Sequence, residues 1–109
     1  MFESITKKSF IDLLKKSENE LIFSRLNLSE KGSEKVMQAL YNGNFEVDRG
    51  RRCTSANTNS ITFTGGSKLY LTPDAKYYKY NDVIIQYCEK YDSFDELYKY
   101  SIIAYVINN

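Results

Sequence analysis

At Gly43 the hydrophobic pattern of this sequence changes its period, and that change limits the folds open to the chain. Before Gly43, apolar residues return at the spacing of an α-helix. After it, apolar and polar residues alternate with the period of two that is typical of a β-strand. Helices followed by strands predict an α+β fold with a mostly antiparallel sheet.

Two helices are expected before the change of period. The first runs from Ser4 to about Ser17, with lysines on its solvent side. The second begins at Ser29 or Ser33, because either serine supplies an N-cap oxygen. It ends at Gly43, since glycine adopts the left-handed C′ conformation without a Cβ penalty. Its buried residues are expected to be Val36, Met37, Leu40 and Tyr41. The apolar run 21–23 between the helices is too short to assign.

Six strands are expected after Gly43, within one domain that covers residues 1–109. In chain order they are residues 45–47, 60–64, 68–72, 77–80, 83–88 and 100–107. Gly65-Gly66-Ser67 predicts one hairpin, because glycine supplies positive φ at little cost, and Asn81-Asp82 predicts another. A capping box at Ser93 predicts a short helix before the last strand, although a longer helix over 100–107 stays open. The prediction is therefore two N-terminal helices, then a mostly antiparallel sheet of five or six strands.

The composition argues against catalysis. The chain has no histidine, so it lacks the usual general base at neutral pH and any histidine-based metal site. No sequence motif of a hydrolase, a metalloprotease or a phosphate-binding loop occurs. We therefore expect a non-enzymatic protein without metal or cofactor. No apolar run is long enough to span a membrane, so a cytoplasmic protein is expected.

The two cysteines, Cys53 and Cys88, are too far apart for a zinc motif. Two free thiols in a reducing compartment are expected, with a disulfide as the alternative. Arg51 and Arg52 flank Cys53 and are expected to lower the pKa of its thiol. No neighbouring residue is able to relay a proton, so Cys53 is not predicted to be catalytic. Cys88 is expected in the core.

Positive charge is concentrated just before the first hairpin. Three of the four arginines, Arg49, Arg51 and Arg52, fall within four positions, and Lys68 follows the hairpin turn. Guanidinium groups form paired hydrogen bonds with carboxylates and phosphates, so the three arginines are candidate partner-binding residues, and the ammonium group of Lys68 is expected to join them. The alternative is that they form salt bridges with nearby acids such as Glu46. With a net charge of +1, any contact with nucleic acid has to come from such a local patch.

Tyrosine is the second unusual feature. Nine of the ten tyrosines lie between Tyr70 and Tyr105, too many for the core of so small a domain. Tyrosine is enriched where proteins meet partners, because it brings a large contact area with little loss of entropy. Tyr70, Tyr78 and Tyr80 are therefore the expected anchor residues.

About twenty residues carry a resemblance to other proteins. The segments are Arg51-Arg52-Cys53-Thr54, Thr58-Asn59-Ser60-Ile61-Thr62-Phe63 and Gly66-Ser67-Lys68-Leu69-Tyr70-Leu71. This pattern resembles one found in small uncharacterised phage or mobile-element proteins of low-GC Firmicutes. The resemblance implies a phage setting, in which small proteins often inhibit host defence, including anti-CRISPR proteins.

The expected function follows from these features together. The chain is predicted to be a phage-encoded protein that binds a host defence protein, such as a CRISPR effector or other defence nuclease, in the bacterial cytoplasm. It would inhibit that partner by steric occlusion through a basic, tyrosine-rich sheet surface. The alternative is a small nucleic-acid-binding protein in which the arginines hold phosphates and the tyrosines stack on bases. A protein that sequesters a nucleotide signal is a third reading.

Overall fold

The computed structural model of the protein describes residues 2–16, 18–47, 52–57, 59–66, 68–71, 74–89 and 98–108. The elements in this part of the chain are, in order, β1 (Glu3–Ile5), α1 (Lys7–Lys16), β2 (Glu18–Leu28), α2 (Glu30–Asn42), β3 (Cys53–Ala56), β4 (Ser60–Phe63), β5 (Lys68–Tyr70), β6 (Lys76–Tyr80), β7 (Val83–Cys88) and β8 (Tyr100–Asn108).

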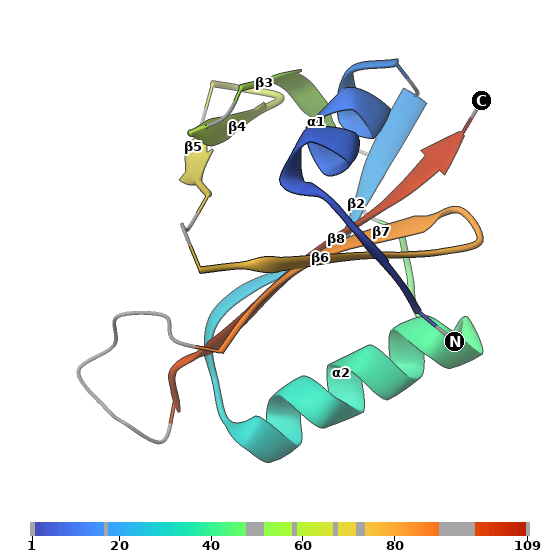
Figure 1. The fold of residues 1–109 in the computed structure, drawn as a ribbon, viewed down its shortest axis with the longest axis vertical. Coiled ribbons are helices and arrows are strands. Elements are labelled where there is room, and N and C mark those ends of the chain that lie inside the picture. Colours follow the sequence, from blue (N-terminus) through green and yellow to red (C-terminus); the bar gives the residue numbers. More distant parts are fainter. Residues whose placement is uncertain are drawn as a thin grey trace.

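These strands form two antiparallel sheets. The larger has five strands in the order β1-β6-β7-β8-β2, and the smaller has three in the order β3-β4-β5. Helix α1 and the small sheet lie on one side of the large sheet, and α2 lies on the other (Figure 1). The large sheet is thus the middle layer of three.

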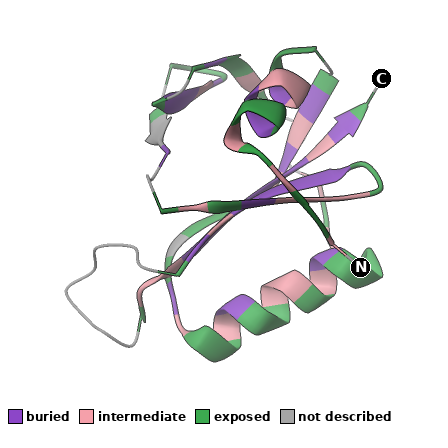
Figure 2. Ribbon diagram, viewed as in Figure 1, coloured by how far each residue is buried: buried purple, intermediate pink, exposed green. Residues whose placement is uncertain are grey.

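Each face of the large sheet has its own core. On the first face, Phe10 of α1 and Ile61 of β4 pack in one cluster with Ile84 and Tyr105. Figure 2 shows the buried residues running along the central strands. Because β7 and β8 are covered on both faces, they read as nearly continuous apolar runs rather than as alternating patterns.

The second core lies beneath α2. Leu40 of α2 packs with Val83 and Ile85 of β7 and with Ile102 and Ala104 of β8. Neighbouring residues of one strand point to opposite faces, so Ile84 and Ile85 serve different cores. The two cores hold the helices at fixed positions on the sheet.

Helix α2 has the two ends that its sequence predicts. Ser29 is its N-cap, and the Ser29 hydroxyl accepts a hydrogen bond of 3.0 Å from the Gly32 N–H. Gly43 has a φ of 75°, and its N–H lies 3.4 Å from the carbonyl oxygen of Leu40. Ser33, the other candidate cap, is buried inside the helix and donates to the Glu30 carbonyl at 2.6 Å.

The predicted order of elements is wrong, although the α+β class agrees with the structure. Strand β1 precedes α1, and the eleven-residue β2 lies between the helices. The short β1 takes its register from β6, some seventy residues away, so nothing local signals it. Strand β2 has irregular register between Leu21 and Phe23 and between Arg25 and Leu28, which interrupts the period of two.

The later strands are a mixture of confirmed and wrong predictions. Both hairpins form, β4 with β5 and β6 with β7, and 100–107 is a strand rather than a helix. Residues 45–47 are not a strand, because Phe45 packs against the core beneath α2 instead. The expected single sheet is two sheets, since β3 pairs with β4 and not with the large sheet. The helix expected from Phe94 lies outside the described residues.

Candidate functional site

The basic candidate residues belong to the small sheet. Arg52 is exposed just before β3, and Lys68 is exposed at the start of β5. Strand β4 separates them, so the two residues lie toward opposite edges of the small sheet. Arg49 and Arg51 lie outside the described residues.

The tyrosine candidates are on β5 and β6. Tyr78 and Tyr80 are half-buried in β6. Tyr70 ends β5 and pairs with Ser60, and its side chain is outside the described part of the structure.

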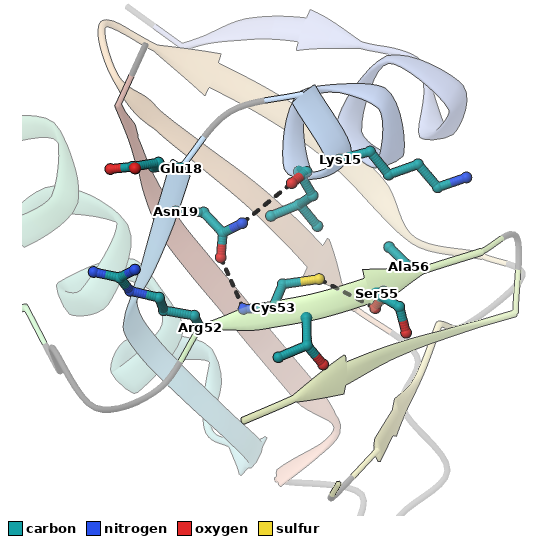
Figure 3. A pocket seen from close by; sticks show the side chains of 9 residues that line it. Lys15, Glu18, Asn19, Arg52, Cys53, Ser55 and Ala56 are labelled. Carbon is teal, nitrogen blue, oxygen red and sulfur yellow. Dashed lines mark hydrogen bonds between the residues drawn. The ribbon is translucent and has the colours of Figure 1, made fainter. Parts of the chain in front are cut away.

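A pocket of about 400 Å³ lies beside Arg52 (Figure 3). It is enclosed by the last turn of α1, the start of β2 and the whole of β3, and we call it the Arg52 pocket. Its lining residues are Leu14, Lys15, Glu18, Asn19, Arg52, Cys53, Thr54, Ser55 and Ala56.

One side chain joins the three elements around this pocket. Asn19 is only 4% exposed, and its Nδ2 donates to the carbonyl oxygen of Leu14 at 3.1 Å. Its Oδ1 accepts from the Cys53 N–H at 2.8 Å. Figure 3 shows Asn19 reaching from β2 to both partners. The amide therefore fixes α1 and β3 relative to β2.

The predicted electrostatics of Cys53 are wrong. Burial raises the pKa of the Cys53 thiol above its ordinary value, and a backbone hydrogen bond of Ser55 only partly opposes this. In Figure 3 the Arg52 guanidinium extends away from the sulfur, so desolvation outweighs the charge. Both Cys53 and Cys88 are free thiols, and Cys88 is buried as predicted.

The two cations at the Arg52 pocket do not converge. Lys15 and Arg52 extend from opposite sides of the pocket in Figure 3. An ion pair joins Lys76 Nζ and Glu89 Oε1, at 3.5 Å, and it does not involve Arg52. Two cations that point apart bind a single phosphate poorly, because only one of them can contact it at a time.

A second surface gathers aromatic rings from three elements. It comprises Phe2 just before β1, Tyr41 of α2, and Tyr78 and Tyr80 of β6, and we call it the tyrosine surface. The Tyr41 and Tyr80 rings stack with centroids 4.7 Å apart and planes 26° from parallel. The Phe2 ring meets both at 5.7 Å, edge to face, and lies 6.3 Å from the Tyr78 ring. These are the favourable arrangements for aromatic pairs.

Part of the tyrosine surface is open to solvent. Tyr41 is 39% exposed, one of two large hydrophobic side chains in the described residues that reach this level. The sequence pattern placed Tyr41 in the buried stripe of its helix and did not single out Phe2. The helical period put Tyr41 beside Leu40, but Tyr41 extends past the edge of the core to meet Tyr80.

We expected arginine and tyrosine side chains on one sheet surface, but Arg52 and Tyr78 lie on different sides of the large sheet. Arg52 lies on the side of the large sheet that α1 and the small sheet cover, whereas Tyr78 packs against the core beneath α2. The middle layer of the fold separates them (Figure 1). The described candidates therefore divide into two surfaces, and the tyrosine surface is the one whose side chains gather.

In the described residues, no group of three or more His, Cys, Asp or Glu side chains is placed to bind a metal ion. The helices of this part of the chain are too short or too polar to cross a membrane. Comparison with protein-family models, with curated proteins and with solved structures finds no match to this chain.

Proposed function

We propose that this protein is a non-enzymatic, phage-encoded binding protein that inhibits a host defence protein, such as a CRISPR effector, by steric occlusion. The tyrosine surface is the contact. The phage setting and the host partner rest on the resemblance carried by residues 51–71, and the bacterial cytoplasm is where such a partner would be met.

The observation that carries the proposal is the stacked Tyr41–Tyr80 pair. Two rings are already held in place by each other and by Phe2, so binding costs them little further side-chain entropy. Tyr41 is 39% exposed and Tyr80 is half-buried, and each ring carries a hydroxyl. Rigid aromatic anchors of this kind dominate the energetics of protein interfaces.

The size of the protein is adequate for occlusion. A typical stable interface buries about 800 Å² per partner. The accessible surface of this protein is 6868 Å², so such a contact takes only a modest share of it. Blocking a partner requires no chemistry beyond this complementary area.

The test is capture of a partner from a low-GC bacterial lysate, with and without nuclease. The wild type and a Tyr41→Ser/Tyr80→Ser variant are compared with Tyr98→Ser, which changes an exposed tyrosine outside the tyrosine surface. We expect the same host protein with the wild type and with Tyr98→Ser, its loss with the double variant, and no effect of nuclease. Equal capture by the double variant, with unchanged thermal stability, would exclude the tyrosine surface as the contact.

The nucleic-acid alternative gives different results in the same experiment. Captured material would disappear after nuclease treatment. Affinity for duplex DNA would fall with salt, with a log–log slope of about −0.9 per phosphate contact. Replacing Arg52 and Lys68 with glutamate would weaken such binding, whereas the proposed contact does not depend on them.

A further inference from the structure

A second pocket lies directly beside the stacked tyrosines. It has a volume of about 380 Å³ and is formed by the C-terminal end of α2, the β6–β7 turn and Val106 of β8. Figure 1 shows the β6–β7 turn above this end of α2, with the N-terminus close by. We call it the turn pocket. Its lining residues are Leu40, Tyr41, Asn42, Gly43, Phe45, Tyr80, Asn81, Asp82, Val83 and Val106.

The first negative contribution to the turn pocket comes from α2. The carbonyl groups at a helix C-terminus carry partial negative charge, which lysine or arginine in the last turn usually offsets. The last turn of α2 has no basic residue. The Gly43 and Asn44 N–H groups bind the carbonyl oxygens of Leu40 and Ala39, at 3.4 and 2.9 Å. The lining residues of the pocket include no lysine or arginine that would offset the charge of this helix end.

The second contribution is the carboxylate of Asp82. Asp82 is exposed in the β6–β7 turn, and its carbonyl oxygen accepts from the Ile107 N–H at 2.8 Å, which fixes the turn on β8. Asn81 has a φ of 51°, as this tight turn requires. Asp82 forms no ion pair with any described residue, and the pocket lining contains no lysine or arginine.

The third contribution is aromatic. Tyr41 and Tyr80 both line the turn pocket, and their rings stack on each other there. The face of a tyrosine ring attracts a cation through its quadrupole. A helix end, a carboxylate and two rings therefore all favour positive charge at the same place.

We infer that the turn pocket receives an arginine side chain of the partner protein. Arginine fits better than lysine because its planar guanidinium stacks on aromatic rings while its N–H groups bind a carboxylate and carbonyl oxygens together. The pocket adjoins the tyrosine surface through Tyr41 and Tyr80, so one partner segment can occupy both. This inference rests on the proposed function only for the identity of the partner, since the pocket chemistry stands on its own.

The test is an NMR titration of the full-length ¹⁵N-labelled protein with a short peptide that contains one arginine. The control peptide carries citrulline, which has nearly the same shape but no charge. We expect saturable shifts of the Gly43 and Asp82 amide signals with the arginine peptide. The citrulline peptide is expected to bind about threefold more weakly. Equal shifts with both peptides, or shifts confined to other residues, would overturn the inference.

Variants of the protein sharpen this test. Asp82→Asn keeps the shape of the turn and is expected to weaken binding of the arginine peptide about threefold. Asp74→Asn changes an exposed aspartate that precedes β6, away from the β6–β7 turn; it is the matched control and should bind as the wild type does. Unchanged affinity in Asp82→Asn would contradict the inference. If this variant unfolds, the comparison of arginine and citrulline peptides on the wild type still decides.

The two proposals fail in distinguishable ways. Absence of arginine binding, together with loss of the captured partner in Tyr41→Ser/Tyr80→Ser, would remove the inference and leave the proposed function standing. Specific arginine binding without any captured partner would support the inference and leave the proposed function without support.

Discussion

Replacing Asn19 tests how the small sheet is held on the rest of the molecule. Asn19 makes two hydrogen bonds across elements, one to the Leu14 carbonyl oxygen and one from the Cys53 N–H. A typical buried hydrogen bond contributes about 1 kcal/mol net. Asn19→Ala removes both, so we expect the free energy of unfolding to fall by about 2 kcal/mol.

The expected fall in the free energy of unfolding is large enough to measure. A domain of this size is stable by roughly 5–15 kcal/mol, and 1 kcal/mol corresponds to about 4–8 °C in Tm. Thermal unfolding followed by circular dichroism should therefore show Asn19→Ala about 10 °C below the wild type. The control is Asn108→Ala, the same chemical change at an exposed position of β8, with an expected effect within about 0.5 kcal/mol.

Asn19→Asp separates the two bonds. The carboxylate still accepts from the Cys53 N–H, but it has no hydrogen to donate to the Leu14 carbonyl oxygen and meets it as a second negative atom. Burial against that oxygen should raise the folded-state pKa of Asp above about 3.9, the unfolded value. The protonated form therefore favours folding: the stability of the variant relative to the wild type should be greatest below about pH 4 and decline as the pH rises through the folded pKa.

Two results would refute this reasoning. One is an Asn19→Ala variant no less stable than Asn108→Ala. The other is an Asn19→Asp variant whose stability relative to the wild type does not change with pH. Either would mean that apolar packing, rather than the Asn19 amide, holds the small sheet in place.

Three further predictions concern single groups. Burial, followed by the charge of Cys88, raises the pKa of Tyr77 to about 12, so stability should decline as the pH rises from the unfolded value of about 10 through 12, and Tyr77→Phe should flatten this decline in alkaline denaturation curves. Cys53 should react with iodoacetamide only at a higher pH than a free cysteine does, because its pKa is raised; a normal pH profile for Cys53, read by mass spectrometry, would contradict this. Ser29→Ala should lower the free energy of unfolding by about 1 kcal/mol, because the Gly32 N–H loses its cap, and an unchanged urea midpoint would count against that role.

The sequence indicated those elements whose signals are local. Ser29 and Gly43 bracket α2, because an N-cap hydroxyl and a left-handed glycine act within one turn of the helix. Gly65 and Gly66, both with φ of 91°, and Asn81 with positive φ mark the two hairpins for the same reason. A turn determines which strands are adjacent, so the pairs β4–β5 and β6–β7 were predictable.

The candidate site was predictable only in part. The excess of tyrosine was visible in the composition, and Tyr78 and Tyr80 do belong to the tyrosine surface. Phe2 and Tyr41 join them from other elements, and no spacing in the sequence relates those positions to β6. Arg52, in contrast, directly precedes β3 and lies on the opposite side of the large sheet.

The amino-acid sequence by itself therefore determines local features: the ends of α2, the tight turns, and which apolar runs must be buried. The division into two sheets, the place of β1 beside β6, and the meeting of Phe2, Tyr41 and Tyr80 were decided only by tertiary packing. The physical reason is that hydrophobic burial is not directional. An apolar pattern indicates that one face of an element is covered, but the shapes of all the elements together determine which segment covers it.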